Sequence, residues 1–185
     1  GTEPRSRAER ISSRDQLIGG PKAIGDIGDY LLENDRIRLV IADKVAGRGV
    51  TLFGGSVLDA DLVRPGGDES SGRDQLTELL PGFLFEVIEP REIAILADGS
   101  GGGPARIAVR GNGGDLIEAL AVLNTGLLYP PSLEFEQIYS LYPGQSHVEI
   151  TTRITNVSPG AHPLPYLNPS ELRDLGLEVD GLEDL

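Results

Sequence analysis

The segment from Leu133 to Gly160 constrains the fold of this 185-residue chain more than any other. Aromatic and apolar residues alternate with polar ones up to Leu141, and residues 147–156 alternate again. Between them lies Tyr-Pro-Gly-Gln at residues 142–145. Alternation with a period of two predicts β-strands, and a Pro-Gly pair between two such runs predicts a turn. We therefore expect one long antiparallel hairpin.

Similar short runs recur along the chain at spacings of roughly 8–12 residues, with turn residues between them. In residues 36–42, for example, Ile37, Leu39 and Ile41 face one way. Asn34-Asp35 predicts a tight turn, and the glycine-rich residues 98–104 and 111–115 predict two more hairpin loops. Residues 116–123 are apolar on both faces, which predicts a central strand paired with the hairpin. The pattern favours an all-β fold, an antiparallel two-sheet β-sandwich of the supersandwich kind.

One or two short helices complete the prediction. Asp74 is placed to cap a helix at residues 75–80, and Asn168 with Pro169 is typical of a helix start. Residues 1–22 have few apolar side chains and predict a flexible arm. We expect the sandwich domain to span residues 23–168, followed by an acidic helix or linker at residues 169–185.

Composition excludes several functional classes. The net charge of −13 argues against nucleic acid and anionic membrane surfaces as partners. No apolar run approaches the roughly 18 residues that span a bilayer. The absence of cysteine excludes disulfides and thiolate metal sites. Arginine strongly outnumbers lysine, which we take as a sign of a bacterial genome rich in G and C. The chain begins at Gly1 and contains no methionine, so we expect a piece of a longer protein, exported or displayed at the cell surface.

Catalytic motifs are incomplete. No G-x-S-x-G nucleophile elbow occurs, and the glycine-rich loops lack the lysine and helix of a phosphate-binding loop. His147 falls in the same strand phase as Glu149 and Arg153, on the polar face of a half-buried strand. His162 lies in a proline-rich loop, and such loops often border binding sites.

Two further sets of residues are candidates for binding. Oxygen ligands suit calcium, and Asp59, Asp61 and Asp68 surround a glycine-rich loop, although no EF-hand pattern is present. Paired carboxylates such as Glu134 and Glu136 can flank a glycosidic bond, but an ordinary polar strand face explains them equally. Sugars stack on exposed aromatic rings, and the available platforms are Tyr129, Tyr139, Tyr142 and Tyr166.

The hairpin also carries a family resemblance. Its Tyr139-x-Leu141-x-Pro143-Gly144 run, followed by a strand that ends at Asn156-x-Ser158, resembles the central hairpin of galactose-mutarotase-like β-sandwiches. That superfamily includes aldose epimerases and the β-domains of glycoside hydrolases and polysaccharide lyases. The resemblance covers residues 24–168 and implies His162 as the nearest match to a catalytic histidine. Pro163-Leu164-Pro165 stands where that pattern has aromatic residues.

Two functional hypotheses follow. The first is a non-catalytic module of a larger exported bacterial protein that binds carbohydrate or another protein domain, through Tyr139, Tyr142, His147, Glu149, Arg153 and Tyr166. The alternative is the front part of a carbohydrate-active enzyme of the epimerase or lyase kind, with His162 as acid or base. Whether this chain alone is an enzyme stays open, and no cofactor is expected other than calcium.

Overall fold

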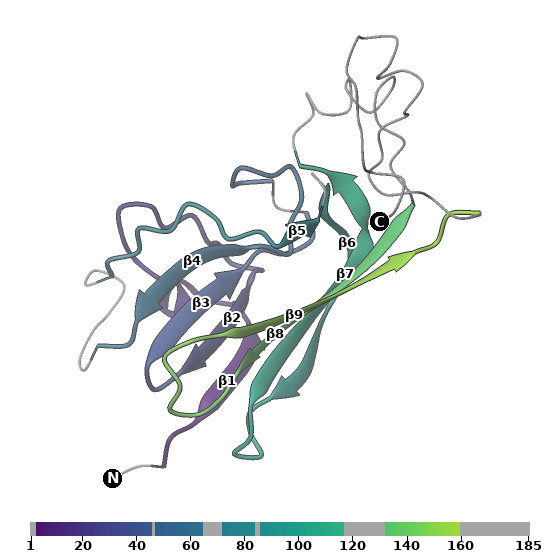
Figure 1. The fold of residues 1–185 in the computed structure, drawn as a ribbon. Helices are drawn as coiled ribbons and strands as arrows, with labels where there is room; N and C mark the ends of the chain where they lie inside the picture. The colour runs from purple at the N-terminus through teal and green to yellow at the C-terminus, as the bar shows by residue number, and fades with distance from the viewer. Residues whose placement is uncertain (1–2, 46, 65–71, 84–85, 117–131, 160–185) are drawn as a thin grey trace, which may run out of the picture.

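The computed structural model describes residues 3–45, 47–64, 72–83, 86–116 and 132–159. These residues form two antiparallel sheets packed as a β-sandwich, which confirms the predicted fold class (Figure 1). The N-terminal sheet has the order β1-β2-β3-β4, formed by Ser6–Arg10, Tyr30–Asn34, Ile37–Ile41 and Val57–Leu62. The C-terminal sheet has the order β5-β6-β7-β8-β9, formed by Gly82–Phe83, Glu86–Asp98, Ala105–Asp115, Leu133–Leu141 and Glu149–Asn156.

The predicted hairpin is confirmed as β8 and β9, which pair from Leu133 opposite Asn156 to Ser140 opposite Glu149. The other edge of β8 pairs with β7 over residues 105–112. The predicted partner of the hairpin, residues 116–123, lies outside the described residues apart from Leu116. Because β7 and β9 occupy both edges of β8, that partner is not needed to complete the middle of the sheet.

The hairpin β6–β7 corrects one predicted loop. Strand β6 runs through Pro90, with shifts of register after Pro90 and after Ile95. Residues 111–115 are not a loop but the end of β7. Glycine at 111 permits this, because a Cβ there would lie 1.9 Å from the carbonyl oxygen of Glu89 on β6. The other predicted loop, residues 98–104, does connect the two strands.

The core lies between the two sheets, where the alternating side chains of both inner faces meet. The buried residues include Leu32, Leu39, Ile41 and Val57 from the first sheet and Ile107, Val109, Phe135, Tyr139 and Leu141 from the second. Val148, Ile150 and Ile154 pack against this cluster from β9 and the residue that precedes it. The inward phase predicted for residues 36–42 is therefore confirmed.

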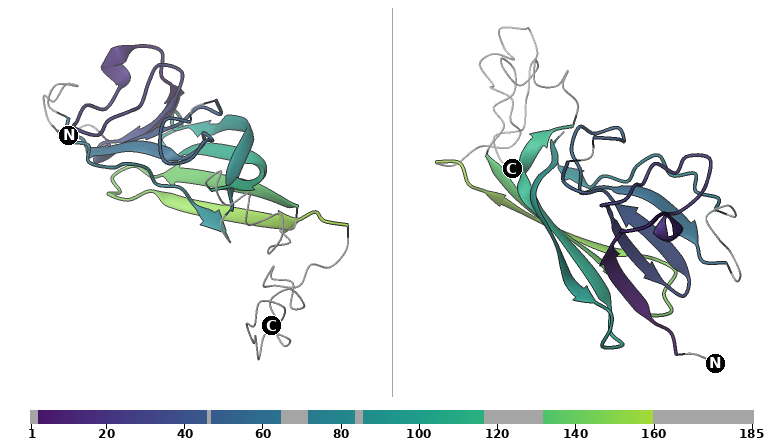
Figure 2. Two further views of the ribbon diagram at one scale, coloured as in Figure 1. Left: turned by 90° about the horizontal axis from the view of Figure 1, so that it is seen from above. Right: turned by 180° about the vertical axis from the view of Figure 1, so that it is seen from behind.

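The N-terminal segment is not a flexible arm. Residues 6–10 form β1, the edge strand that pairs with β2. Ile11, Leu17 and Ile18 are almost fully buried and cover Leu31 and Val40 on the outer face of the N-terminal sheet. Figure 2 shows this segment, with the short 3-10 helix η1 (Arg14–Gln16), on the side of that sheet away from the C-terminal sheet. These three apolar side chains are enough to hold the segment against the sheet.

The helix predicted at residues 75–80 is also absent. Asp74 does not cap a helix; its Oδ1 accepts hydrogen bonds from the backbone N–H groups of Ala60 and Leu76. Leu79 instead forms an isolated bridge with Val57 at the start of β4. The segment is therefore extended, and Asp74 fastens it to β4. The helix predicted after Asn168 lies outside the described residues.

Candidate binding surface

A row of alternating charges crosses the outer face of the C-terminal sheet. The register places Glu92 on β6 opposite Arg110 on β7, Arg110 opposite Glu136 on β8, and Glu136 opposite Arg153 on β9. We call these four residues the charge ladder. Each member projects away from the core, because its neighbours in the chain, such as Val109 and Phe135, point inward. Four strands thus contribute one side chain each to a single line.

The ladder is held together by ion pairs. Arg110 Nε donates to Glu136 Oε1 at 2.7 Å, and Arg110 Nη1 lies 3.5 Å from Glu92 Oε2. Arg153 Nη1 lies 3.4 Å from Glu136 Oε2. The hydrogen bond that Arg110 donates to Glu136 raises the pKa of Arg110 above its ordinary value, with Glu92 adding to the effect. Such exposed cross-strand pairs contribute roughly 0.2–1 kcal/mol each, so they mainly orient the side chains.

A depression of about 370 Å³ lies over the ladder. Besides the four ladder residues it is lined by Arg91, Gly111, Glu134, Phe135 and Thr155. Its floor is formed where Gly111 lets β7 approach β6 beside the irregularity at Pro90. The lining offers guanidinium donors and carboxylate acceptors within one small area. In the described part of the chain, Arg91 and Glu134 have no ion-pair partner, which leaves them available to a ligand.

Several predicted binding residues lie on this side of the sheet. Glu149 and Arg153 are exposed on β9, while Ile150 and Ile154 between them face the core. His147 lies just before β9 begins. Of these residues only Arg153 lines the depression, so the polar face of β9 forms one border of the site.

Neither of the two predicted tyrosines that the structure describes offers a freely exposed ring. Tyr139 is wrongly assigned to the surface: it is fully buried, and its hydroxyl donates to the carbonyl oxygen of Gly55 at 2.9 Å. Tyr142 is half-buried in the turn after β8, where its hydroxyl accepts from Arg106 at 3.4 Å. Tyr129, Tyr166 and His162 lie outside the described residues, so their predicted roles stay predictions.

The predicted calcium ligands have other partners. Asp59 is fully buried and accepts hydrogen bonds from the backbone N–H groups of Ile24 and Gly25, and burial raises its pKa to about 6. The carboxylate of Asp61 receives both terminal nitrogens of Arg64, whose hydrogen bonds lower its pKa to about 2. Asp68 lies outside the described residues, among which no group of three acidic or histidine side chains is placed to hold a metal ion. Asp59 and Asp61 are thus engaged by groups of this chain, and the calcium site stays a prediction.

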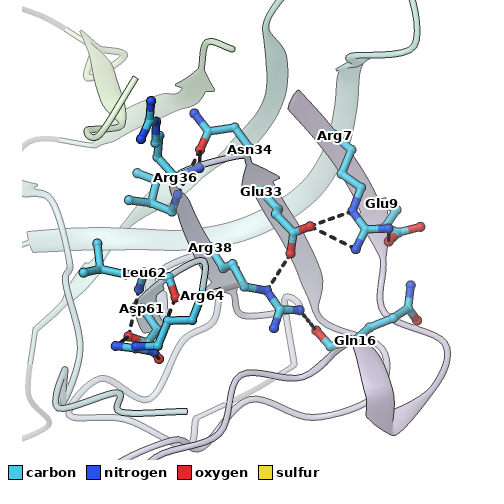
Figure 3. A network of polar contacts seen from close by, with 11 residues as sticks. Arg7, Glu9, Gln16, Glu33, Asn34, Arg36, Arg38, Asp61, Leu62 and Arg64 are labelled. Carbon is cyan, nitrogen blue, oxygen red and sulfur yellow. Dashed lines mark hydrogen bonds and ion pairs between the residues drawn. The ribbon is translucent and has the colours of Figure 1, made fainter. Parts of the chain in front are cut away.

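A second depression, of about 240 Å³, lies on the outer face of the N-terminal sheet. Figure 3 shows the polar contacts among its lining residues. Arg38 Nε donates to Glu33 Oε2 at 2.5 Å, and Arg38 Nη2 donates to the carbonyl oxygen of Gln16 at 3.0 Å. Arg7 also pairs with Glu33, at 3.2 Å. Arg38 thereby fastens η1 to the sheet, so the network holds a segment of the chain in place. We therefore assign this network to stability.

Glu86, at the start of β6, was not among the predicted residues. Burial raises its pKa to about 7, with the charge of Asp115 adding to the effect. Its Oε2 is buried without a hydrogen-bond partner in the described part of the chain. Glu86 belongs to no recognisable motif, so only its burial beside Gly113 of β7 identifies it.

The pairing of Glu92 with Arg110 was likewise not predicted from the sequence. In the alternating residues 105–110, Arg110 falls on the opposite face of the strand from Ile107 and Val109. Its partners follow from strand register, which depends on the irregularities of β6. No local sequence signal gives that register.

The fold and this surface together define a β-sandwich with one exposed, charged sheet face. No helix among the described residues is long and apolar enough to cross a membrane. No family model, curated protein or solved structure matches the chain.

Proposed function

We propose that this chain is a non-catalytic module of a larger exported bacterial protein, and that it binds carbohydrate in the depression over the charge ladder. The observation that carries the proposal is the arrangement of the ladder itself. Guanidinium and carboxylate groups alternate along one line, on a sheet face that no other described segment covers.

The chemistry of the lining fits sugar hydroxyls. A carboxylate accepts hydrogen bonds from two neighbouring hydroxyls, and a guanidinium donates two parallel ones. A volume of about 370 Å³ lies near the lower end of the range of small-ligand sites, roughly 300–1,000 Å³. Protein interfaces, in contrast, are depleted of charged residues at their centres. These features favour a small polar ligand over a protein domain.

The described lining of the depression contains no exposed aromatic ring, and this sets the affinity that we expect for a sugar. Phe135 contributes only a small exposed area, because the residue is 3% exposed. Without stacking, binding depends on hydrogen bonds that also compete with water. We therefore expect dissociation constants near the millimolar end of the scale.

The test is a titration followed by heteronuclear NMR. The probes are maltotetraose, cellotetraose and tetragalacturonate, so that neutral and acidic chains are both represented. We expect at least one to shift the backbone resonances of β7 and β8 in wild-type protein. Arg110→Gln removes the centre of the ladder and should abolish the shifts. Arg7→Gln, which removes an arginine of similar exposure from the other sheet, should leave them unchanged. If none of the three probes shifts these resonances, the proposal is wrong.

The enzyme alternative depends on His162, which lies outside the described residues. No observation on the ladder favours catalysis, because both oxygens of Glu136 are held by arginines. Binding is therefore the function that the geometry supports best.

A further inference from the structure

Strand β9 has one edge without a partner among the described residues. It closes the order of the C-terminal sheet, with β8 on its inner side (Figure 1). Its pairing with β8 runs over Glu149–Asn156 without the register shifts that interrupt the pairings of β3 with β4 and β6 with β7. It contains no proline or glycine. A regular edge strand of this kind is a template for pairing with another strand.

The backbone groups on the free edge can be assigned. The N–H of Val157 donates to the carbonyl oxygen of Ser132 at 2.8 Å, so residue 157 turns its backbone groups toward the strand that precedes it. In an antiparallel ladder this direction alternates from residue to residue. Thr151 and Arg153 therefore turn theirs toward β8, whereas Ile150, Thr152 and Ile154 turn theirs outward.

The side chains of β9 match those of a second β9 in one particular register. If Thr151 lies opposite Thr151 of an antiparallel second copy, Glu149 lies opposite Arg153 of that copy, and the two-fold axis repeats the pair. Both pairs fall at positions without backbone hydrogen bonds, where side chains approach most closely. Ile150 and Thr152, whose backbone groups point outward, fall at the hydrogen-bonded positions.

Neighbouring registers lose this match. A slip of one residue places core-facing residues opposite outward-facing ones. A slip of two residues, with Thr152 opposite Thr152, places Glu149 opposite Thr155 and removes both direct ion pairs. Arg153 is free to serve a second carboxylate, because its side chain is 77% exposed and its pairing with Glu136, at 3.4 Å, is loose.

We propose that β9 pairs with β9 of a second copy of this chain, antiparallel and centred on Thr151, so that two C-terminal sheets form one continuous sheet. The partner is a second copy because the strand carries its own charge complement at positions 149 and 153. The pairing places two charge ladders side by side on one face of the joined sheet.

Charge reversal tests the proposal by sedimentation velocity over a concentration series. Wild-type protein should form a dimer. Glu149→Arg places arginine opposite arginine, and Arg153→Glu places glutamate opposite glutamate, so each variant alone should dimerise at least tenfold more weakly. Mixing the two variants restores both ion pairs and should give a heterodimer. Melting temperatures show whether the variants stay folded, since neither change touches the core.

Cysteine substitution tests the register, because the natural chain has no cysteine. Opposed residues across the joint lie roughly 4.5–5.5 Å apart at Cα, within the range that a disulfide spans. Thr151→Cys should therefore form an interchain disulfide on mild oxidation, whereas Thr152→Cys should not. A monomeric wild type, a mixture no stronger than its components, or preferential cross-linking through position 152 would overturn the proposal. Glu149 does not line the depression, so loss of the dimer with retained sugar binding in Glu149→Arg would leave the proposed function standing.

Discussion

The side chain of Asn34 joins two hairpin turns that are far apart in the sequence, and we expect its removal to be costly. Its Oδ1 accepts from the backbone N–H groups of Arg36 and Ile37, at 2.8 and 2.9 Å. Its Nδ2 donates to the carbonyl oxygens of Tyr142 and Gln145, at 2.7 and 2.8 Å. The residue is 5% exposed, so water replaces these four bonds poorly.

The magnitude follows from those bonds. A net contribution of about 1 kcal/mol for each gives a loss of about 2–4 kcal/mol for Asn34→Ala, with the lower end applying if water reaches the turns. Asn34→Asp keeps the shape and the two accepted bonds, but it directs an oxygen at two carbonyl oxygens. We expect it to cost about 3 kcal/mol at pH 7, because two donated bonds are lost and repulsion is added.

The Asn34→Asp variant also carries a pH signature. The two carbonyl oxygens raise the pKa of the introduced carboxyl group in the folded variant above its unfolded value, so the folded state takes up a proton as the pH falls. The stability deficit of the variant against wild type should therefore shrink between pH 7 and pH 4.5, since the protonated carboxyl donates one bond again.

Urea denaturation at both pH values measures these changes. Asn156→Asp is the control, because Asn156 is exposed and its Oδ1 only accepts from Ser158; we expect a change within about 0.5 kcal/mol. The reasoning fails if Asn34→Asp is as mild as this control, or if its deficit is the same at both pH values.

Two further predictions concern buried polar groups. Burial raises the pKa of Asp59 to about 6 and of Glu86 to about 7, so the folded state binds more protons than the unfolded state, and stability should fall as the pH rises from about 4 to 7. Thermal melts across this range measure the slope, which Asp59→Asn should reduce; stability that rises with pH would contradict this. Tyr139→Phe should cost about 1–3 kcal/mol in urea denaturation, because the buried carbonyl oxygen of Gly55 loses its donor, and a loss under about 0.5 kcal/mol would show that water replaces the hydroxyl.

The sequence predicts the strands of this fold well where one face is buried. The alternation of residues 36–42 and 147–156 follows directly from packing against the core, and so does the hairpin that joins β8 and β9. The turn residues at 34–35 and 98–104 lie where the structure turns, between β2 and β3 and between β6 and β7. These elements are local, so a short window of residues contains the information that specifies them.

The errors occur where a distant contact decides the structure. Asp74 and the residues after it resemble a capped helix, but Ala60 and Val57 of β4 bind this segment in an extended form. Residues 111–115 resemble a glycine loop, but the close approach of Glu89 on β6 turns them into strand. From the sequence, Tyr139 resembles an exposed platform for a sugar, but its hydroxyl donates a hydrogen bond to the carbonyl oxygen of Gly55 in the core. None of these partners lies near its counterpart in the sequence.

The two outer faces of the sandwich differ in a way that favours the C-terminal sheet for the proposed binding. The N-terminal sheet is covered by its own chain: Ile11 and Ile18 pack on it, Arg38 holds η1, and Asp59 binds the backbone at residues 24–25. Its charged groups are used to hold these segments. In the described part of the chain the C-terminal sheet has no such cover, and its charges form a line along which Arg91 and Glu134 have no ion-pair partner. A polar face whose groups are ordered by cross-strand pairs and not covered by loops loses little entropy when a ligand replaces water on it. Arg153 belongs both to this line and to the edge strand β9, so the surface that we propose binds a ligand continues into the edge that we propose pairs with a second copy.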